Sequence, residues 1–377
     1  MNIQHKLAAA VAVVVAAGIA LTGCSSASGS ADGSTGATSA KTATSASAFG
    51  GMDKLVEAAN KEGQLNVIAL PHDWANYGKI LAAFKKKYPK ITVKEASPDV
   101  SSAEEIQAAK TNQGLDTAPD VFDLGLTVAL QNTDQFASYK VQTWKDIPSA
   151  LKDSKGRFTG DYGGYMSIGY DSSKYPKPTS LNDLLKSSYK SAVSLNGDPT
   201  QAGAAFAAVG LATALKSGNL NNFQSGIDFF QKLNAAGNMK NVDVTTATVA
   251  SGETPVVFDW DYLNATHTAD NASWKTVILP GVGYASYYNQ AINKDAPHPA
   301  AARLWQEFLY SDQGQNLWLQ GGARPVRSAA MEKAGTIDKT ALAKLPKAPA
   351  KYVIPTEKQS NDAGTLLGSK WAAAVGQ

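Results

Sequence analysis

In the first part of the folded chain, segments with an apolar residue at every third or fourth position alternate with short apolar or every-second-position segments. The first spacing is typical of helices and the second of strands. These spacings predict helices at 53–62, 76–88 and 103–112 and strands at 65–70, 91–95 and 119–124. In the second helix Tyr77, Ile80 and Phe84 share one face, and Pro89 ends the helix. Strands that alternate with helices in this way indicate mainly parallel sheets flanked by helices, which is the α/β fold class.

The same kind of pattern continues in the second half of the chain. It predicts strands at 166–171, 192–195, 255–260 and 275–279, an extended stretch at 284–292, and helices at 180–186, 201–216, 224–236 and 298–310. Asp198 and Pro199 stand where an N-cap and a first-turn proline would begin the helix at 201–216. The folding part, about 325 residues, exceeds what one hydrophobic core usually spans, so we expect two lobes, the second inserted into the first.

The N-terminus has the pattern of an export signal. Lys6 precedes an apolar run from Leu7 to Leu21, which is too short for a membrane span but typical of a signal peptide, here residues 1–23. The run ends in Leu-Thr-Gly before Cys24, the chain's one cysteine, and this motif resembles a bacterial lipobox. The resemblance implies that Cys24 is acylated and anchors the protein, whereas the alternative is a free thiol after an ordinary cleavage site. Residues 24–52 are rich in Ser, Ala and Gly, which predicts a flexible tether.

Composition excludes several classes of protein. Lys and Arg number 35 against 32 Asp and Glu, a balance that argues against a nucleic-acid binder, which needs a basic stripe. One cysteine excludes an intramolecular disulfide and a cysteine-based zinc site. The histidines show no metal-ligand spacing, and we interpret His72 and His298 as surface polar groups. No common catalytic motif is present, so we predict no catalytic residues, no cofactor and no metal.

Four sequence blocks resemble a known family. They are Leu-Asn-Gly-Asp-Pro at 195–199, Gly-Ile-Asp-Phe-Phe at 226–230, Gly-Glu-Thr-Pro-Val-Val-Phe-Asp-Trp at 252–260, and Ala-Pro-His-Pro-Ala-Ala-Ala-Arg-Leu at 296–304. Together they are similar to blocks of the solute-binding lipoproteins of bacterial ABC importers, in the branch that holds spermidine/putrescine, ferric-ion, thiamine and phosphonate binders. The resemblance covers about 55–370 and implies a type 2 periplasmic-binding fold, in which two lobes joined by two crossover strands enclose a ligand.

The resemblance also implies an organisation and partners. The first lobe would comprise residues 53–166 plus 288–377, and the second, inserted lobe residues 167–287. A protein of this family binds a small-molecule solute and delivers it to an ABC permease and its ATPase. We therefore expect an extracytoplasmic monomer, lipid-anchored to the outer face of the bacterial cell membrane, that is not an enzyme.

In such folds, ligand residues lie at the carboxyl ends of strands and at helix N-termini facing the crevice. Applied to this chain, that rule selects Trp74, Tyr77, Asp123, Asp198, Gln201, Trp260, Tyr262, Tyr287 and Asn289. The corresponding loops are rich in aromatic and carboxylate side chains and contain no Lys or Arg. Aromatic faces attract cations and carboxylates accept N–H bonds, so this composition favours a cationic solute.

Polyamine binders are similar at several of these positions. Trp74 and Tyr77 match first-lobe aromatics, Asp198 matches a carboxylate that pairs with an amine, and Trp260 and Tyr287 match two rings that sandwich the chain. The sequence departs from the pattern at Gln201 and Asn289, where polyamine binders usually carry acids. The resemblance therefore implies a polyamine-like cation, with one amine end unpaired or a ligand of lower charge.

Three alternatives remain open at this stage. Tyr287 and Tyr288 resemble the consecutive tyrosines of ferric-ion binders, although neighbouring residues on a strand point to opposite faces, so that only one would reach the ligand. A helix N-terminus at 200–203 would suit phosphonate or another anion. The third alternative is a surface lipoprotein enzyme or sensor of the same fold. Only one of Asp259 and Asp261, which flank Trp260, is expected to face the crevice.

Overall fold

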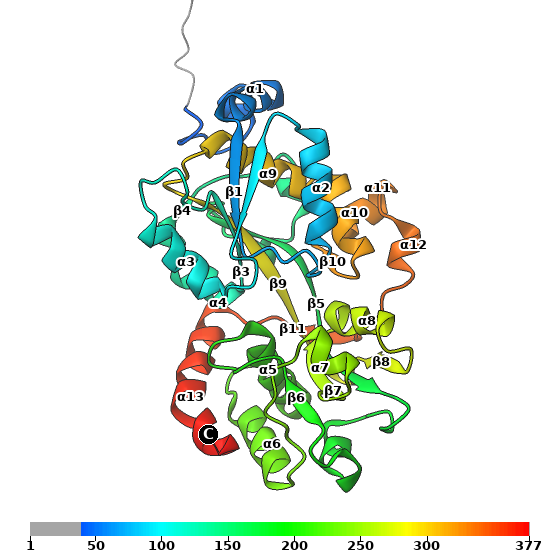
Figure 1. Ribbon diagram of the computed structural model, residues 1–377. Helices are drawn as coiled ribbons and strands as arrows, with labels where there is room; N and C mark the ends of the chain where they lie inside the picture. Colours follow the sequence, from blue (N-terminus) through cyan, green and yellow to red (C-terminus); the bar gives the residue numbers. More distant parts are fainter. Residues whose placement is uncertain (1–38, 377) are drawn as a thin grey trace, which may run out of the picture. The chain divides into compact units, whose positions relative to one another are not determined.

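The computed structural model of the chain describes residues 39–376 (Figure 1). The predicted signal peptide 1–23 and the predicted lipidation site Cys24 lie outside the described residues. Within that part of the chain, none of the helices combines the length and hydrophobicity that a membrane crossing requires.

The first β/α elements agree with the predicted order. They are α1 (Met52–Glu62), β1 (Gln64–Ile68), α2 (Tyr77–Lys87), β2 (Thr92–Ala96), α3 (Ser102–Thr111) and β3 (Val121–Leu124). A further helix that was not predicted, α4 (Leu126–Gln131), follows β3. Strands β1 and β2 pair in parallel, and α2 buries the face that carries Tyr77, Ile80 and Phe84. A capping box between Ser101 and Glu104 starts α3 by satisfying backbone N–H groups at its first turn.

Two long strands, β5 (Phe158–Asp171) and β9 (Val282–Asn293), run through the large sheet. Residues 158–165 of β5 pair antiparallel with β9, and its later residues pair with β7 (Val256–Trp260) and β8 (Trp274–Val277). The register shifts between Gly160 and Gly163, where two residues of β5 lie opposite one residue of β9. Only the second half of β5 was predicted, because the Gly-rich first half shows no alternation of apolar residues.

The next elements complete the other end of the large sheet. They are β6 (Val193–Leu195), α5 (Gly203–Ser217), α6 (Gln224–Ala235), α7 (Thr246–Ala250) and α8 (Asp261–Thr266). Strand β6 pairs in parallel with β7, and α6 packs against α5. The predicted helix at 180–186 is a 3-10 helix, Leu181–Leu185. The predicted helix at 201–216 is α5, but the N-cap role predicted for Asp198 is wrong. The N-cap of α5 is Ala202, and the carboxylate of Asp198 accepts from the backbone N–H of Thr200 and closes a local turn.

The C-terminal elements return to both ends of the sheet. They are α9 (Pro299–Leu309), α10 (Asp312–Gln320), β10 (Arg324–Pro325), α11 (Ser328–Ala334), α12 (Lys339–Leu342), β11 (Lys351–Val353) and α13 (Glu357–Val375), and a short strand β4 (Phe136–Ala137) lies earlier in the chain. Figure 1 shows α1, α2, α9 and α10 around one end of the molecule and α5, α6 and α13 around the other. The α/β class is confirmed, but the pairing is more mixed than expected: β1–β2, β6–β7 and β9–β11 are parallel, and the other pairs are antiparallel.

Part of the expected tether is folded. Ala43 and Ala46 are buried, and the guanidinium of Arg303 on α9 donates to the carbonyl oxygens of Ala43 (2.8 Å) and Lys41 (2.9 Å). The Ser/Ala-rich composition predicted a flexible segment because it lacks apolar periodicity. Alanines are nevertheless small enough to pack against a helix when an arginine fixes the neighbouring backbone.

Candidate functional site

Four aromatic rings from separate parts of the chain meet beside the long strands. We call Trp74, Tyr162, Tyr262 and Tyr288 the ring cluster. The Trp74 ring lies 5.7 Å from Tyr288 at 79° and 6.4 Å from Tyr262 at 80°. Tyr162 stacks on Tyr288 with 5.5 Å between centroids and 7° between planes. Trp74 follows β1, Tyr162 and Tyr288 lie on β5 and β9, and Tyr262 lies on α8. The cluster therefore joins the two-stranded sheet, the long strands of the large sheet, and the helix that follows β7.

A chain of hydrogen bonds fixes the orientation of these rings. The indole Nε1 of Trp74 donates to the hydroxyl of Tyr162 over 2.7 Å, and that hydroxyl donates to Oδ2 of Asp123 over 3.0 Å. Tyr162 and Asp123 are buried, whereas Trp74 is partly exposed. The orientation of the partly exposed Trp74 ring is therefore fixed by the buried phenol of Tyr162, which is in turn bound to the buried carboxylate of Asp123.

Two buried carboxylates, Asp123 and Asp161, share one amide group. Nε2 of Gln290 lies 3.2 Å from Oδ1 of Asp123, 3.0 Å from Oδ2 of Asp161 and 3.0 Å from the hydroxyl of Tyr77. Burial raises the pKa of Asp123, and burial together with the charge of Asp123 raises the pKa of Asp161. In the described part of the chain, neither carboxylate forms an ion pair with a Lys or Arg.

Asp259 and Asp261 flank Trp260, and both are buried. Asp259 lies on β7, whereas Asp261 begins α8. Asp259 accepts from Nδ2 of Asn196 over 2.8 Å, and burial raises the pKa of Asp259 to about 7. Asp261 pairs with Arg324 at 3.4 Å, yet burial outweighs this partner and raises the pKa of Asp261 to about 6.

The predicted residues Trp260 and Tyr262 lie at the end of β7 and the start of α8. The Trp260 ring is buried and lies 6.4 Å from the Tyr284 ring. Nε1 of Trp260 and the hydroxyl of Tyr262 are both buried without a hydrogen-bond partner within residues 39–376. Tyr262 is a member of the ring cluster, whereas the Trp260 ring packs against Tyr284.

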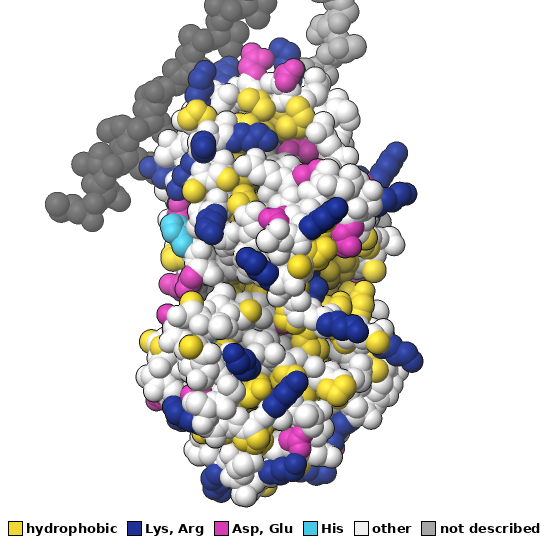
Figure 2. All heavy atoms as spheres, turned by 90° about the vertical axis from the view of Figure 1, so that its right-hand side faces the viewer, with side chains coloured by type: hydrophobic (Ala, Val, Ile, Leu, Met, Phe, Trp, Pro, Cys, Tyr) yellow, Lys and Arg dark blue, Asp and Glu magenta, His cyan; other side chains and the backbone are white. Residues whose placement is uncertain are grey.

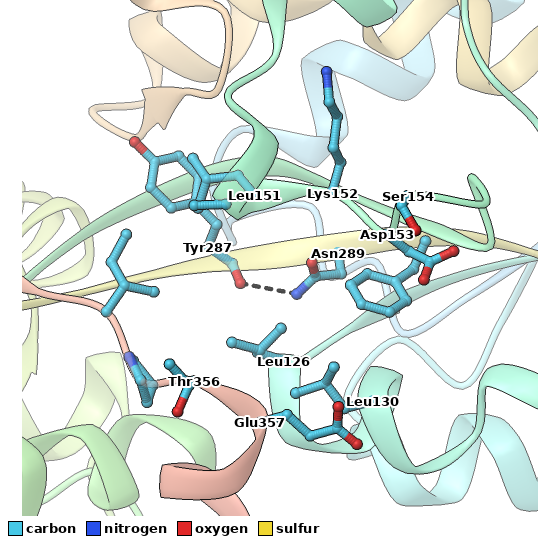
Figure 3. Close-up of a pocket in the computed structure, with 14 residues that line it drawn as sticks. Leu126, Leu130, Leu151, Lys152, Asp153, Ser154, Tyr287, Asn289, Thr356 and Glu357 are labelled. Carbon is cyan, nitrogen blue, oxygen red and sulfur yellow. Dashed lines mark hydrogen bonds between the residues drawn. The ribbon is translucent and has the colours of Figure 1, made fainter. Parts of the chain in front are cut away.

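Strand alternation separates the predicted residues Tyr287 and Asn289 from the ring cluster. Tyr288 and Gln290 face the cluster and its carboxylates, so Tyr287 and Asn289 point to the opposite face of β9. There they line a pocket of about 370 Å³. Figure 3 shows these two side chains with Leu126 and Leu130 of α4, residues 151–154, and Thr356 and Glu357 at the start of α13. The alternation was predicted correctly, but the tyrosine in the ring cluster is Tyr288 rather than Tyr287.

Asp198 and Gln201 do not contact the ring cluster through any described hydrogen bond. Gln201 is exposed and Asp198 partly exposed, and the carboxylate of Asp198 is occupied by the backbone N–H and hydroxyl of Thr200. Their loop reaches the site through Asn196, which donates to Asp259. The structure thus brings together four of the nine predicted residues, namely Trp74, Tyr77, Asp123 and Tyr262, in and around the ring cluster.

Sequence reasoning missed the residues that connect these four. They are Asp161, Tyr162 and Gln290, together with Tyr288, which the sequence suggested only for the ferric-ion alternative. Asn196, also missed, contacts Asp259. Asp161 and Tyr162 stand in the sequence Phe-Thr-Gly-Asp-Tyr-Gly-Gly, where a charged and an aromatic residue between glycines were a usable signal of a bent strand at a site. The side of β9 that faces the cluster depends on strand register, which the sequence does not reveal.

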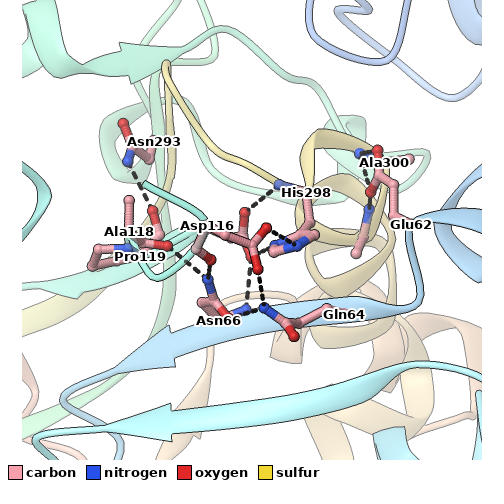
Figure 4. A network of polar contacts seen from close by, with 11 residues as sticks. Glu62, Gln64, Asn66, Asp116, Ala118, Pro119, Asn293, His298 and Ala300 are labelled. Carbon is pink, nitrogen blue, oxygen red and sulfur yellow. Dashed lines mark hydrogen bonds and ion pairs between the residues drawn. The ribbon is translucent and has the colours of Figure 1, made fainter. Parts of the chain in front are cut away.

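A second polar network lies at the opposite, amino-terminal ends of β1 and β3 (Figure 4). His298 was expected at the surface but is buried there, with Nδ1 3.0 Å from Asp120 and Nε2 3.3 Å from Asp116. Glu62 accepts from the backbone N–H groups that begin α9. Burial alone would lower the pKa of His298, but the hydrogen bond to Asp120 and the nearby carboxylates raise it.

Charges on the visible surface are dispersed. The face shown in Figure 2 carries Lys and Arg side chains interspersed with acidic and uncharged groups rather than gathered in one stripe. Among residues 39–376, no three His, Cys, Asp or Glu side chains are grouped in a way that could hold a metal ion.

Comparison with known proteins identifies the family. The sequence model of the family described as bacterial extracellular solute-binding protein matches residues 117–348. A comparison with curated proteins finds no match.

Solved structures share the fold at low sequence identity. The periplasmic binding protein AfuA from Actinobacillus pleuropneumoniae, with fructose-6-phosphate bound, has a TM-score of 0.64 at 18% identity, covering 83% of this chain and 99% of that one. A ferric binding protein from Campylobacter jejuni has a TM-score of 0.61 at 15% identity, covering 82% and 99%. The sulfate-binding protein SubI from Mycobacterium tuberculosis has a TM-score of 0.57 at 17% identity, covering 83% and 95%. With a family match over more than half of its length, this chain belongs to the bacterial extracellular solute-binding proteins.

Proposed function

We propose that the protein is the solute-binding receptor of an ABC import system and makes and breaks no covalent bond in its solute. Its two lobes, residues 53–166 plus 288–377 and residues 167–287, would close on a small solute, and the closed form would dock on the permease and its ATPase. Support comes from β5 and β9, which pair with strands at both ends of the large sheet. Strands that belong to both lobes are suited to act as a hinge.

We further propose that the receptor is an extracytoplasmic monomer held at the outer face of the cell membrane by acylated Cys24. The motif before Cys24 supports the anchor. Acyl chains contribute roughly 0.8 kcal/mol per buried CH₂ group, so several chains hold a protein at a membrane surface. The folded residues from 41 onward would leave a shorter flexible tether than the sequence suggested.

The solute that the site suits best is a small cation, with a polyamine as the first compound to test. The fold does not choose the solute, because structures that share it are described with a sugar phosphate, ferric ion and sulfate. The choice of a cation rests on one observation. The ring cluster lies against the buried carboxylates of Asp123, Asp161 and Asp259, and none of these three pairs with a Lys or Arg in the described part of the chain.

Physical chemistry explains why this arrangement favours a positive charge. Burying a carboxylate without a counter-ion is costly, and the raised pKa of Asp259 reports that cost. A cation bound beside the carboxylates would reduce it, and desolvated cation–π contacts contribute about 2 kcal/mol each. Two such contacts with a carboxylate contribution would support a micromolar complex, which corresponds to roughly −8 kcal/mol.

The proposal is tested by thermal-shift and calorimetric titration of the purified protein with polyamines, other amines, ferric citrate, phosphonates, sulfate and sugars. A solute at 100 times its Kd stabilises the folded state by about 2.7 kcal/mol. We expect amines to raise the melting temperature, and Trp74→Ala to weaken their binding at least tenfold. Trp144→Ala is the matched control, because Trp144 is also partly exposed but lies outside the ring cluster. Binding of anions alone, or equal loss in both variants, would refute the cation proposal.

A further inference from the structure

A solute that approaches the ring cluster meets aromatic faces before it meets carboxylates. Trp74 and Tyr288 are partly exposed, whereas Asp123, Asp161 and Asp259 have at most 5% of their surface exposed. Burial, together with nearby carboxylates that include Asp259, raises the pKa of the Tyr262 and Tyr288 hydroxyls. The negative charge therefore lies behind the rings, where it acts through space rather than by direct hydrogen bonding.

Each oxygen of these buried carboxylates already accepts one hydrogen bond from the protein. Asp123 accepts from Tyr162 and Gln290, and Asp161 accepts from Gln290 and from the backbone N–H of Tyr162. Asp259 accepts from Asn196 and from the backbone N–H of the following residue. A primary ammonium brings three N–H donors that lose water on binding and need acceptors in return. A fully alkylated ammonium has no N–H donor and makes no such demand.

The orientation of the rings suits a rounded cation. The Trp74 ring stands nearly perpendicular to both Tyr288 and Tyr262, so the planes form adjoining walls rather than one stack. Tyr162 stacks on Tyr288 and accepts from Trp74, which holds the walls in place. Aromatic walls at right angles can present their negatively polarised faces to one cation from several sides.

We propose that the ring cluster recognises an N-methylated, preferably quaternary, ammonium group rather than a primary amine, an inference that rests on the proposed function. Binding is driven by contact of the methyl groups with Trp74 and Tyr288 and by the field of the buried carboxylates. Methylation lowers the cost of removing the cation from water and removes N–H groups that would otherwise lack acceptors.

The test titrates the whole protein with tetramethylammonium and with methylammonium, two ions of equal charge, and follows tryptophan fluorescence and calorimetric heat. The same comparison is made with choline against ethanolamine. We expect each methylated member to bind at least tenfold more tightly than its partner. Tyr288→Leu should abolish this preference, whereas Tyr288→Phe, which keeps the ring, should retain it.

The outcomes separate the two proposals. Equal or tighter binding of the unmethylated ions, or no response to tetramethylammonium, overturns the inference about methylation. If putrescine or spermidine binds in that case, the cation receptor proposal stands. If only anions bind, the cation proposal falls, and the inference about methylation falls with it.

Discussion

His298 illustrates how a single side chain can tie together distant parts of the chain. Its imidazole joins the loop before β3, through Asp120 and Asp116, to the start of α9, where Glu62 of α1 accepts backbone N–H bonds. The sequence predicted a surface histidine because nothing near it in the chain suggests burial. Its partner Asp120 is far away in sequence, so only the folded chain brings the pair together.

Loss of this imidazole should reduce stability in a pH-dependent way. The carboxylates raise the pKa of His298, so its stabilising contribution is complete below the unfolded value of about 6.5 and is lost as pH rises through the folded pKa. We expect His298→Gln to lower the free energy of unfolding by about 1–3 kcal/mol at pH 6 and by less at pH 9. Urea unfolding across this range measures the difference. His72→Gln is the control, because His72 pairs with Glu95 at the exposed surface; a similar loss in both variants would contradict the prediction.

At the scale of elements, α5 and α6 approach closely because one residue lacks a side chain. A Cβ built on Gly226 of α6 would lie 2.3 Å from the carbonyl oxygen of Val209 and 2.5 Å from Oγ1 of Thr213, both on α5. Helical periodicity predicted both helices, because α6 places Ile227, Phe230 and similar residues on one buried face. The periodicity did not predict where the helices touch, since helix contact depends on residues distant in sequence.

Gly226→Ala should therefore destabilise the protein by roughly 1–3 kcal/mol, because the methyl group meets backbone that has little room to move. Gly364→Ala in α13 is the matched control. No atom lies within 4 Å of a Cβ at Gly364, so alanine should be neutral or stabilising by up to about 1 kcal/mol through its higher helix propensity. Urea midpoints of the two variants provide the measurement. Equal stability of both variants and the unmodified protein would show that α5 and α6 separate without cost.

At the scale of the whole molecule, the sequence predicted the fold class and the family more completely than the site. Most helices and strands follow from local periodicity, and the motif blocks alone indicated the solute-binding proteins that the family match confirms. Some predicted residues, such as Trp74 and Tyr262, lie in the ring cluster because strand ends could be located from the sequence. Tyr162, Gln290 and the choice of Tyr288 over Tyr287 escaped prediction, since they depend on the pairing and register of β5 and β9.

The same site makes solute affinity sensitive to pH if the solute is a cation. Burial raises the pKa of Asp259 to about 7 and also raises those of Asp123, Asp161 and Asp261. A cation stabilises the ionised carboxylates, so its binding releases protons, and its Kd should fall as pH rises. For one group the change is at most about tenfold per pH unit.

We therefore expect cation affinity to increase several-fold between pH 5.5 and pH 8, as measured by calorimetry in two buffers that differ in ionisation enthalpy. Asp259→Asn should weaken binding at pH 8 and flatten this dependence, since the amide keeps a polar partner for Asn196 but carries no charge. Asp198→Asn should leave the slope unchanged, because Asp198 is partly exposed and bonded within its own turn. Affinity that is constant or falls with rising pH would mean that the buried carboxylates do not sense the bound charge, and the case for a cation would fail.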